Sequence, residues 1–292
     1  MRMRQSDLIL TALAPAIWGS TYYVTTQHLP DGYPITVAML RALPAGLLLL
    51  LIVKQLPAKE WWCRVFLLGA LNFSIFWGLL FVAAYRLPGG VAATVGAVQP
   101  LIVIFLARSV LGTPILFLSI IAAVTGMIGV ALLVLGPNAE LDSVGVLAAL
   151  GGAISMAAGT VLSRHWQPPI SPLTFTAWQL TAGGLLLLPL ALLMEPTLPE
   201  LNTENVLGLT YLGLIGAAFT YLLWFRGISR IEPSVISTLG FLSPLTALLL
   251  GWGLLDQSLT LIQAVGVIAV LVSVWLSQYA ARRPTKTIPV TE

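Results

Sequence analysis

Ten largely apolar segments with few or no charges follow one another along the chain, separated by charged residues or by Pro, Asn and Gly. Each is long enough to cross the roughly 30 Å of hydrocarbon in a bilayer, which takes a helix of about 20 residues. We therefore predict an all-α integral membrane protein with ten transmembrane helices. The predicted spans are 7–27, 34–53, 65–85, 88–107, 114–135, 142–163, 172–193, 206–225, 233–252 and 259–279.

Positive charges are sorted between alternate loops. If the N-terminus is cytoplasmic, twelve of the 14 Lys and Arg residues lie on the inner side; of the other two, Arg86 lies in an outer loop and Arg41 inside a span. Seven acidic residues, from Asp31 to Asp256, fall on the outer side. Because cytoplasmic loops carry an excess of Lys and Arg, we predict that both termini are cytoplasmic.

Composition agrees with a membrane protein. Hydrophobic residues make up 58% of the chain, charged residues 9%, and the mean hydropathy is +0.95, which excludes an ordinary soluble domain. The uncharged run 8–27 is too long for the core of a cleavable signal peptide, so it is predicted to be the first span. We expect a multi-pass protein of the bacterial inner (plasma) membrane, with residues 280–292 as a disordered tail.

The second half of the chain repeats the first. The segment from Ile35 to Leu50 reappears 138 residues later as Leu173 to Leu188. Five spans per copy is an odd number, so the copies would enter the bilayer from opposite sides, as in many alternating-access transporters. We predict two inverted five-helix repeats, 1–137 and 138–279. Further on, Gly69, Thr94, Gly96 and Pro100 recur 144 residues later as Gly213, Thr238, Gly240 and Pro244.

Short motifs in this order resemble a known family. They are Ala16-Ile17-Trp18-Gly19-Ser20, Met39-Leu40-Arg41-Ala42, and Gly96 to Leu101 with its twin Gly240 to Leu245. The chain resembles a ten-span member of the drug/metabolite transporter superfamily, of the EamA type. Within it, the chain is most similar in character to YddG-type aromatic amino-acid exporters and PecM-like permeases.

The resemblance implies a transporter. Because the spans offer no converging acid, base, nucleophile or metal-ligand set, we also expect no enzyme activity, cofactor or metal. The resemblance also implies that spans 5 and 10 are peripheral, which leaves a homodimer open. One departure limits what carries over: where the family commonly has Gly-Glu before spans 5 and 10, this chain has Gly112-Thr113 and Asp256-Gln257. A role for that glutamate cannot be transferred.

Arg41 is the one formal charge well inside a predicted span. An intramembrane arginine costs at least about 2.5 kcal/mol on insertion scales, so it needs a partner or a wet cavity. It could be a counter-charge for a substrate carboxylate, or a structural arginine that donates to backbone carbonyls of a kinked neighbour. Its counterpart in the second repeat is the uncharged Gln179.

Two prolines and two glycines are predicted to form paired hinges. Proline inside a helix removes a backbone hydrogen bond and kinks the helix. Pro100 and Pro244 fall inside spans 4 and 9, each four residues after a glycine, Gly96 or Gly240. Ordinary packing kinks are the alternative interpretation.

Aromatic and uncharged polar residues at membrane depth are the candidates for lining a central pocket. Such pockets are commonly apolar, with a few hydrogen-bonding groups. For each residue taken alone, helix packing is the competing explanation. The predicted substrate-binding residues are Trp18, Tyr22, Arg41, Asn72, Trp77, Thr94, Gln99, Trp178, Gln179, Tyr221, Thr238 and Ser243.

The predicted function is export of aromatic or other neutral amino acids, or related metabolites, by alternating access around that pocket. The absence of a mid-span Asp or Glu gives a proton relay no candidate residue, so facilitated diffusion stays as open as proton antiport. Alternatives are a multidrug exporter of the same fold and an intramembrane enzyme. The expected partners are a small-molecule substrate and the lipid bilayer, with no nucleic acid.

Overall fold

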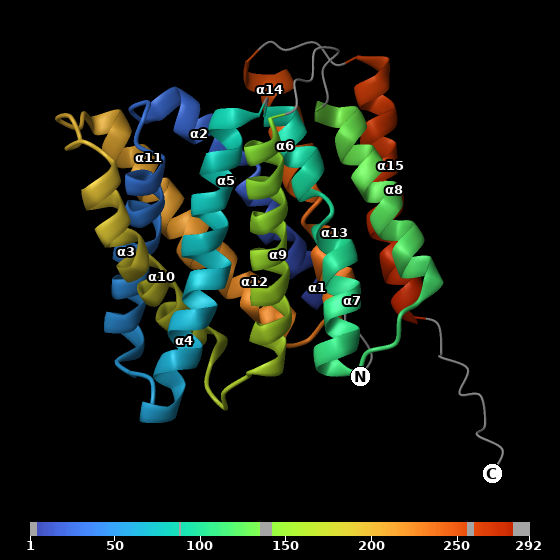
Figure 1. Ribbon diagram of the computed structural model, residues 1–292, viewed down its shortest axis with the longest axis horizontal. Helices are drawn as coiled ribbons and strands as arrows, with labels where there is room; N and C mark the ends of the chain where they lie inside the picture. Colours follow the sequence, from blue (N-terminus) through green and yellow to red (C-terminus); the bar gives the residue numbers. More distant parts are fainter. Residues whose placement is uncertain (1–4, 88, 135–141, 256–259, 283–292) are drawn as a thin grey trace.

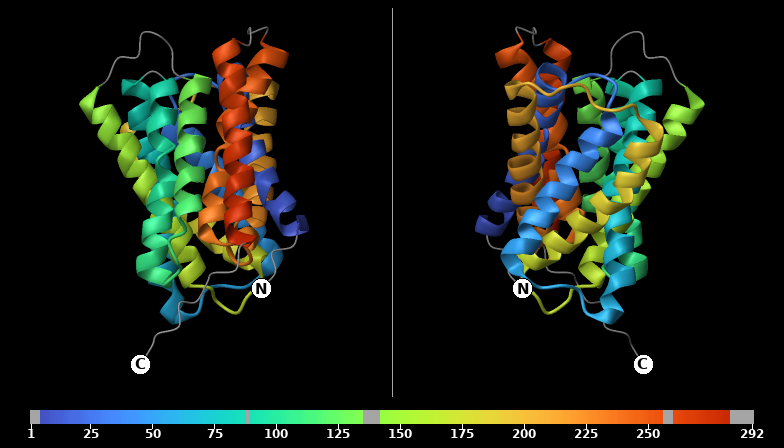
Figure 2. Two further views of the ribbon diagram at one scale, coloured as in Figure 1. Left: turned by 90° about the vertical axis from the view of Figure 1, so that its right-hand side faces the viewer. Right: turned by 90° about the vertical axis from the view of Figure 1, so that its left-hand side faces the viewer.

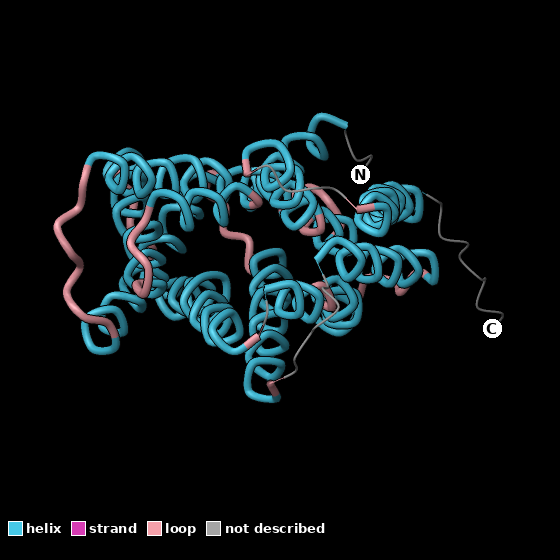
Figure 3. The backbone as a smooth tube through the Cα atoms, turned by 90° about the horizontal axis from the view of Figure 1, so that it is seen from above, coloured by secondary structure: helices cyan, strands magenta, loops and turns pink. Residues whose placement is uncertain are grey.

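The computed structural model describes residues 5–87, 89–134, 142–255 and 260–282, and every regular element in this part is a helix (Figures 1 and 3). Ten helical segments of the described chain are long and apolar enough to cross a membrane, and each overlaps one predicted span. The all-α, ten-span prediction is therefore confirmed. The segments, numbered as spans 1–10, are Gln5–His28, Pro34–Val53, Lys59–Leu80, Val91–Leu111, Phe117–Val134, Ser143–His165, Pro172–Met194, Thr203–Ile228, Pro233–Leu254 and Leu261–Arg282.

Five spans are formed by one uninterrupted helix each, and three of these helices begin with a recognisable start signal. Proline, whose fixed φ suits the first turn, begins α3 at Pro34 and α10 at Pro172. The side chain of Asp142 accepts a hydrogen bond from the Gly145 amide at the start of α9. These helices are α3 (Pro34–Val53), α8 (Phe117–Val134), α9 (Ser143–His165), α10 (Pro172–Met194) and α15 (Leu261–Arg282).

Spans 1, 4 and 9 are interrupted helices. Span 4 breaks after Gly96 and span 9 at Gly240, which are matched positions in the sequence repeat. Pro100 and Pro244 lie in the first turn of the helix that follows each break, where a missing amide proton costs no hydrogen bond. The halves are α1 (Gln5–Trp18) and α2 (Ser20–His28), α6 (Gly89–Gly96) and α7 (Gln99–Leu111), and α13 (Pro233–Leu239) and α14 (Leu242–Leu254).

Spans 3 and 8 each contain a π-helical segment that the sequence analysis did not predict. The two segments, Ala70–Ser74 and Leu214–Phe219, directly follow the repeat-matched glycines Gly69 and Gly213. π segments are rare and concentrate at functional sites. Span 3 consists of the 3-10 turn Lys59–Trp61, α4 (Trp62–Gly69), the π segment and α5 (Ile75–Arg86); span 8 consists of α11 (Thr203–Gly213), the π segment and α12 (Thr220–Ile228).

Spans 2 and 7 cross at two repeat-matched glycines, Gly46 and Gly184. A Cβ on Gly46 would lie 2.5 Å from the Thr181 amide nitrogen, and a Cβ on Gly184 would lie 2.6 Å from the Leu43 Cα. Leu43 and Thr181 are themselves matched in the repeat. The contact between α3 and α10, which cross in Figure 2 (right), is thus reciprocal.

Other helix contacts also follow the correspondence between spans in the two halves of the sequence repeat. The helix α8 packs along α15, joining spans 5 and 10 at one side of the bundle (Figures 1 and 2). Span 3 packs on span 6 through α5 and α9, and span 8 packs on span 1 through α12 and α1. The helix α1 begins, and α15 ends, at the lower end of the bundle in Figure 1.

Two predicted boundaries, the start of the C-terminal tail and the boundary between the repeats, lie at or beyond the edge of the residues that the structure describes. The helix α15 continues to Arg282, so residues 280–282 are helical rather than part of a disordered tail, because the apolar pattern of span 10 runs on through Ala280 and Ala281. Residues 283–292 and the predicted repeat boundary at 137/138 lie outside the described residues. The same holds for Asp256-Gln257.

Candidate functional site

A cavity of about 250 Å³ lies in the middle of the bundle, and we call it the central chamber. It collects side chains from spans 1, 2, 3, 4, 6, 8 and 9, so both halves of the chain contribute to it. Interrupted and π-helical segments border it on several sides. Its lining residues are Trp18, Thr21, Arg41, Phe76, Trp77, Leu80, Gln99, Met156, Tyr221, Trp224, Gly240 and Ser243.

Aromatic rings form much of the chamber wall. The ring of Trp18 lies 4.9 Å from that of Tyr221 and 5.0 Å from that of Trp224. The indole nitrogen of Trp18 donates to the Thr220 hydroxyl at 2.9 Å, which fixes the ring at the end of α1. Such rings offer a large, rigid apolar surface to a solute.

Arg41 joins this wall to the irregular part of span 8. Its Nη2 donates to the carbonyl of Gly216 at 2.6 Å, inside the π segment Leu214–Phe219. Its guanidinium also lies over the ring of Trp77, 5.1 Å from the centroid, which is a cation–π contact. The side chain is 8% exposed, and its Nε has no hydrogen-bond partner among the described residues.

Other chamber residues also carry polar atoms without partners in the described part of the chain. These are the Thr21 hydroxyl, the Gln99 amide nitrogen and the Trp224 indole nitrogen. A buried polar group without a hydrogen bond costs about 1–3 kcal/mol. All three groups can donate, as can the Arg41 Nε, so the chamber suits a ligand with hydrogen-bond acceptors.

A second cavity, of about 370 Å³, adjoins the central chamber along the breaks in spans 4 and 9. The two share Trp18, Leu80, Gln99, Gly240 and Ser243 as lining residues. All four predicted hinge residues, Gly96, Pro100, Gly240 and Pro244, line this second cavity.

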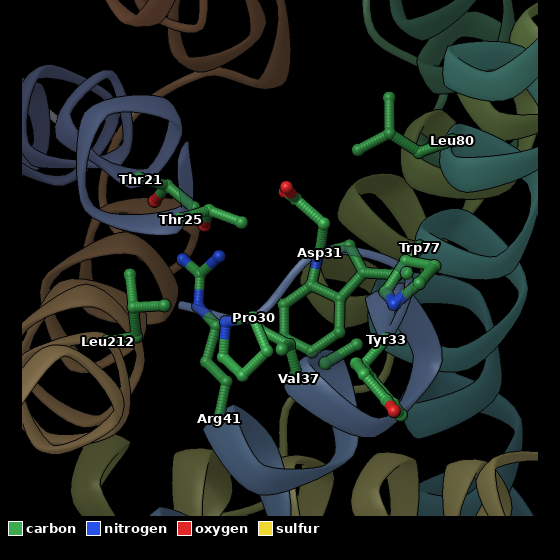
Figure 4. A pocket seen from close by; sticks show the side chains of 13 residues that line it. Thr21, Thr25, Pro30, Asp31, Tyr33, Val37, Arg41, Trp77, Leu80 and Leu212 are labelled. Atoms are coloured by element: carbon green, nitrogen blue, oxygen red, sulfur yellow. The ribbon is translucent and has the colours of Figure 1, made fainter. Parts of the chain in front are cut away.

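A third cavity, of about 230 Å³, lies between the central chamber and the turn between α2 and α3, and we call it the outer cavity, after the side on which the charge sorting predicts this turn. It shares Thr21, Arg41, Trp77 and Leu80 with the chamber. Figure 4 shows the Arg41 guanidinium, the Trp77 ring and the Asp31 carboxylate around this space. The chamber thus has a neighbouring cavity toward one end of the bundle.

Ion pairs lie at the two opposite ends of the described helices. Asp7 in α1 contacts Arg226 at 2.6 Å and Arg230 at 3.2 Å, and its side chain is 8% exposed. Asp142, the residue before α9, lies 3.7 Å from Arg86 at the end of α5, with 40% of its side chain exposed. Arg86 and Arg230 are matched in the sequence repeat.

Comparison with known proteins agrees with this architecture. The profile of the EamA-like transporter family matches two segments of the chain, residues 5–135 and 143–279. The chain belongs to the EamA-like transporter family.

Relatives of this EamA-like protein include Protein PecM of Dickeya dadantii, 47% identical over 94% of both chains. The uncharacterized inner membrane transporter YedA of Escherichia coli K12 is 28% identical, with 100% of this chain and 98% of YedA covered. A crystal structure that is 18% identical superposes with a TM-score of 0.81, covering 96% of this chain and all of the other. The chain is therefore a multi-pass inner-membrane transporter with the EamA fold.

The EamA-like fold brings half of the predicted substrate-binding residues together. Around the central chamber it assembles, from both halves of the chain, Trp18, Arg41, Trp77, Gln99, Tyr221 and Ser243.

Two predicted site residues lie outside the cavities and bond to each other. Asn72 donates to the Gln179 side chain at 2.8 Å and to the Ser163 hydroxyl at 3.2 Å, and both Asn72 and Gln179 are fully buried. They join spans 3, 6 and 7 in the interior of the EamA-like fold.

Three of the remaining predicted site residues do not line these cavities. Trp178 is buried and donates to the Gln55 carbonyl at 2.6 Å, and Thr238 donates to the Val235 carbonyl at 2.8 Å. Thr94 is half-buried in α6, outside the lining of the three cavities. The side chain of Tyr22 lies outside the described part of the structure.

Five chamber residues were missed by sequence analysis: Thr21, Phe76, Leu80, Met156 and Trp224. Trp224 follows Tyr221 by three residues and so shares its helix face, which was a usable signal. Asp7 was also missed, although it is an acid at the very start of span 1. Among the described residues, no cluster of His, Cys, Asp and Glu could hold a metal ion.

Proposed function

We propose that the protein exports amino acids, aromatic or other neutral ones, or related metabolites, by alternating access around the central chamber. The observation that carries this proposal is the combination of aromatic walls with unpartnered hydrogen-bond donors in one chamber. A solute with an aromatic body and a carboxylate would pack its ring against these walls and accept hydrogen bonds from these donors.

The aromatic walls favour a flat apolar body. Trp18, Trp77, Tyr221 and Trp224 all line the chamber, and aromatic pairs contribute about 0.5–1.5 kcal/mol beyond their area burial. A substrate ring inserted among them would gain the same kind of contact. This supports aromatic amino acids over small polar ones.

The polar lining favours an acceptor on the solute. Gln99, Trp224 and Arg41 each carry an unpartnered N–H group in the described structure, and a carboxylate can accept several such bonds. The described chamber lining contains no Asp or Glu. A cationic drug would therefore lack a counter-charge there, which favours amino-acid export over the multidrug alternative.

Alternating access needs one end to be closed while the other is open. We propose that the ion pairs of Asp7 with Arg226 and Arg230 close the cytoplasmic end, joining span 1 to span 8. The pair Arg86–Asp142 would close the outer end, joining span 3 to span 6. Because the inner pair is shorter and more buried, the inner end would be the more firmly closed of the two in this structure.

The motion would use the inverted relation of the two halves, 1–137 and 138–279, with the N-terminus in the cytoplasm. The reciprocal contacts of Gly46 and Gly184 at the crossing of spans 2 and 7 support that relation. The matched breaks at Gly96 and Gly240, followed by Pro100 and Pro244, are the proposed hinges. They border the second cavity, so a change at a break would reshape the space beside the chamber.

Transport by the purified protein in liposomes tests the proposal. Labelled phenylalanine and tryptophan should enter protein-containing vesicles faster than empty ones, and excess unlabelled substrate should suppress this uptake. Uptake that does not respond to an imposed pH gradient would indicate facilitated diffusion, whereas acceleration by the gradient would indicate proton coupling. No uptake of either amino acid, with uptake of a cationic dye instead, would favour the multidrug alternative.

A further inference from the structure

We propose that the outer cavity is a binding site for the zwitterionic head of an α-amino acid. In this site Arg41 receives the carboxylate and Asp31 receives the ammonium group. The inference rests on the proposed function and adds a recognition site at the mouth of the transport path.

Arg41 supplies the positive side of the site. A guanidinium has five N–H groups, and the hydrogen bond to Gly216 uses one of them. The Nε–H has no partner among the described residues, and the side chain lines both the outer cavity and the central chamber. The bond to Gly216 and the Trp77 ring hold the group in place, so it is preorganised for a carboxylate.

Asp31 supplies the negative side. It lies in the turn between α2 and α3 and lines the same cavity from the outer end. In the described structure it makes no ion pair with Arg41 or with any other cationic side chain. Its carboxylate is exposed and therefore hydrated, and a solute's ammonium group can reach it from the outer solution.

The two unpaired opposite charges distinguish this cavity from the central chamber. Both charges line one space of about 230 Å³, and they do not neutralise each other (Figure 4). An α-amino acid carries its carboxylate and its ammonium on the same carbon, so it can bridge them. A carboxylic acid without an amino group would satisfy Arg41 alone, and an amine would satisfy Asp31 alone.

The cavity also offers a path for the solute's side chain. Trp77 and Leu80 line both cavities, and Thr21 and Thr25 also line the outer cavity. A head group held here would let an apolar side chain lie along Trp77 toward the chamber. In export, this site would be the last one occupied before release.

Binding to the purified full-length protein in nanodiscs tests the site, with three matched ligands measured by titration calorimetry. Phenylalanine has both charged groups, 3-phenylpropionate lacks the ammonium, and phenethylamine lacks the carboxylate. Because Asp31 is exposed, Asp31→Asn should weaken phenylalanine binding by about two- to fivefold and leave 3-phenylpropionate unchanged. The control Glu204→Gln removes an exposed charge of α11 that lies outside the three cavities, and it should change neither ligand.

Each outcome decides one point. Unchanged phenylalanine affinity in Asp31→Asn would overturn the zwitterion site and leave the proposed substrate class standing. An equal loss of affinity for phenylalanine and 3-phenylpropionate would also overturn the zwitterion site, because Asp31 would then not be binding the ammonium group. If the wild-type protein bound neither phenylalanine nor any other neutral amino acid, the proposed substrate class would fail as well.

Discussion

Asp7 and Arg226 form an ion pair of 2.6 Å that joins the start of span 1 to the end of span 8. Arg230 adds a second cation to the same carboxylate at 3.2 Å. At the opposite end of the bundle, Arg86 and Asp142 lie 3.7 Å apart with half or nearly half of their side chains exposed. The two ion pairs, at repeat-related places, thus differ in distance and in burial. Such a difference is expected of a transporter in which one end is closed more firmly than the other.

Asp7→Asn should destabilise the protein far more than Arg86→Gln. Removing one partner of a mostly buried pair leaves uncompensated charge, and because Arg226 is 23% exposed we expect a loss of about 1–3 kcal/mol. An exposed pair contributes only about 0.2–1 kcal/mol, so Arg86→Gln should change stability little. Thermal unfolding in the same detergent measures both. Equal shifts for the two variants would contradict the assignment of Asp7 to a closed end.

Gly46→Val and Gly184→Val should each prevent a normal yield of folded protein. Their side chains would meet the backbone of the facing helix, at Thr181 or Leu43, and backbone cannot move aside cheaply. Gly78→Ala is the matched control, because nothing lies within 4 Å of its added Cβ and alanine favours a helix. Size-exclusion profiles of the three variants provide the measurement. A normal profile for either valine variant would show that spans 2 and 7 do not cross so closely.

Asn72→Ala should lower stability without changing substrate affinity. It removes the 2.8 Å hydrogen bond to the buried Gln179 and leaves the Gln179 Oε1 only the longer 3.5 Å bond from the Ser163 hydroxyl, at a cost of about 1–3 kcal/mol. Gln99→Ala should do the reverse, because Gln99 lines the chamber with its amide nitrogen unpartnered in the described structure. Unfolding temperature and transport KM separate the two effects. An altered KM in Asn72→Ala, with stability unchanged, would return Asn72 to the site.

Arg41→Lys should fold less well than the wild type and lose most transport. Lysine keeps the charge but cannot hold the Gly216 carbonyl and present a second, fixed N–H to a carboxylate at the same time. Arg41→Ala should be worse in yield, because it also removes the contact with Trp77. Yield and transport should be measured together. If Arg41→Ala folded normally and lost only carboxylate-bearing substrates, the bond to Gly216 would have no structural importance.

Much of the fold was predictable because the bilayer imposes simple demands. A helix must be apolar for about 20 residues to cross, which placed all ten spans. The breaks in spans 4 and 9 were also expected, since Pro100 and Pro244 cannot continue an undisturbed helix. The π segments after Gly69 and Gly213 were not expected, because no residue type in Ala70–Ser74 or Leu214–Phe219 demands them.

The site was less predictable, because the spans are apolar on nearly every face. Asn72 and Gln99 are both polar amides at membrane depth, yet one is bonded to Gln179 and the other lines the chamber. Trp178 and Trp224 are both buried tryptophans, and the chamber is lined by Trp224. Residue type cannot distinguish the two members of such a pair, since both are tolerated equally well inside a membrane-spanning helix.

The sequence by itself determined the number of spans, the duplicated pattern and the family, because hydropathy, proline chemistry and residue order are written directly in the chain. The tertiary structure alone decided which polar groups pair with one another and which have no partner in the described part of the chain. It brought Asp7 to Arg226 and Arg41 to Gly216 across more than a hundred residues. Such contacts depend on how helices rotate and cross, and helices with little amphipathic contrast do not encode that rotation locally.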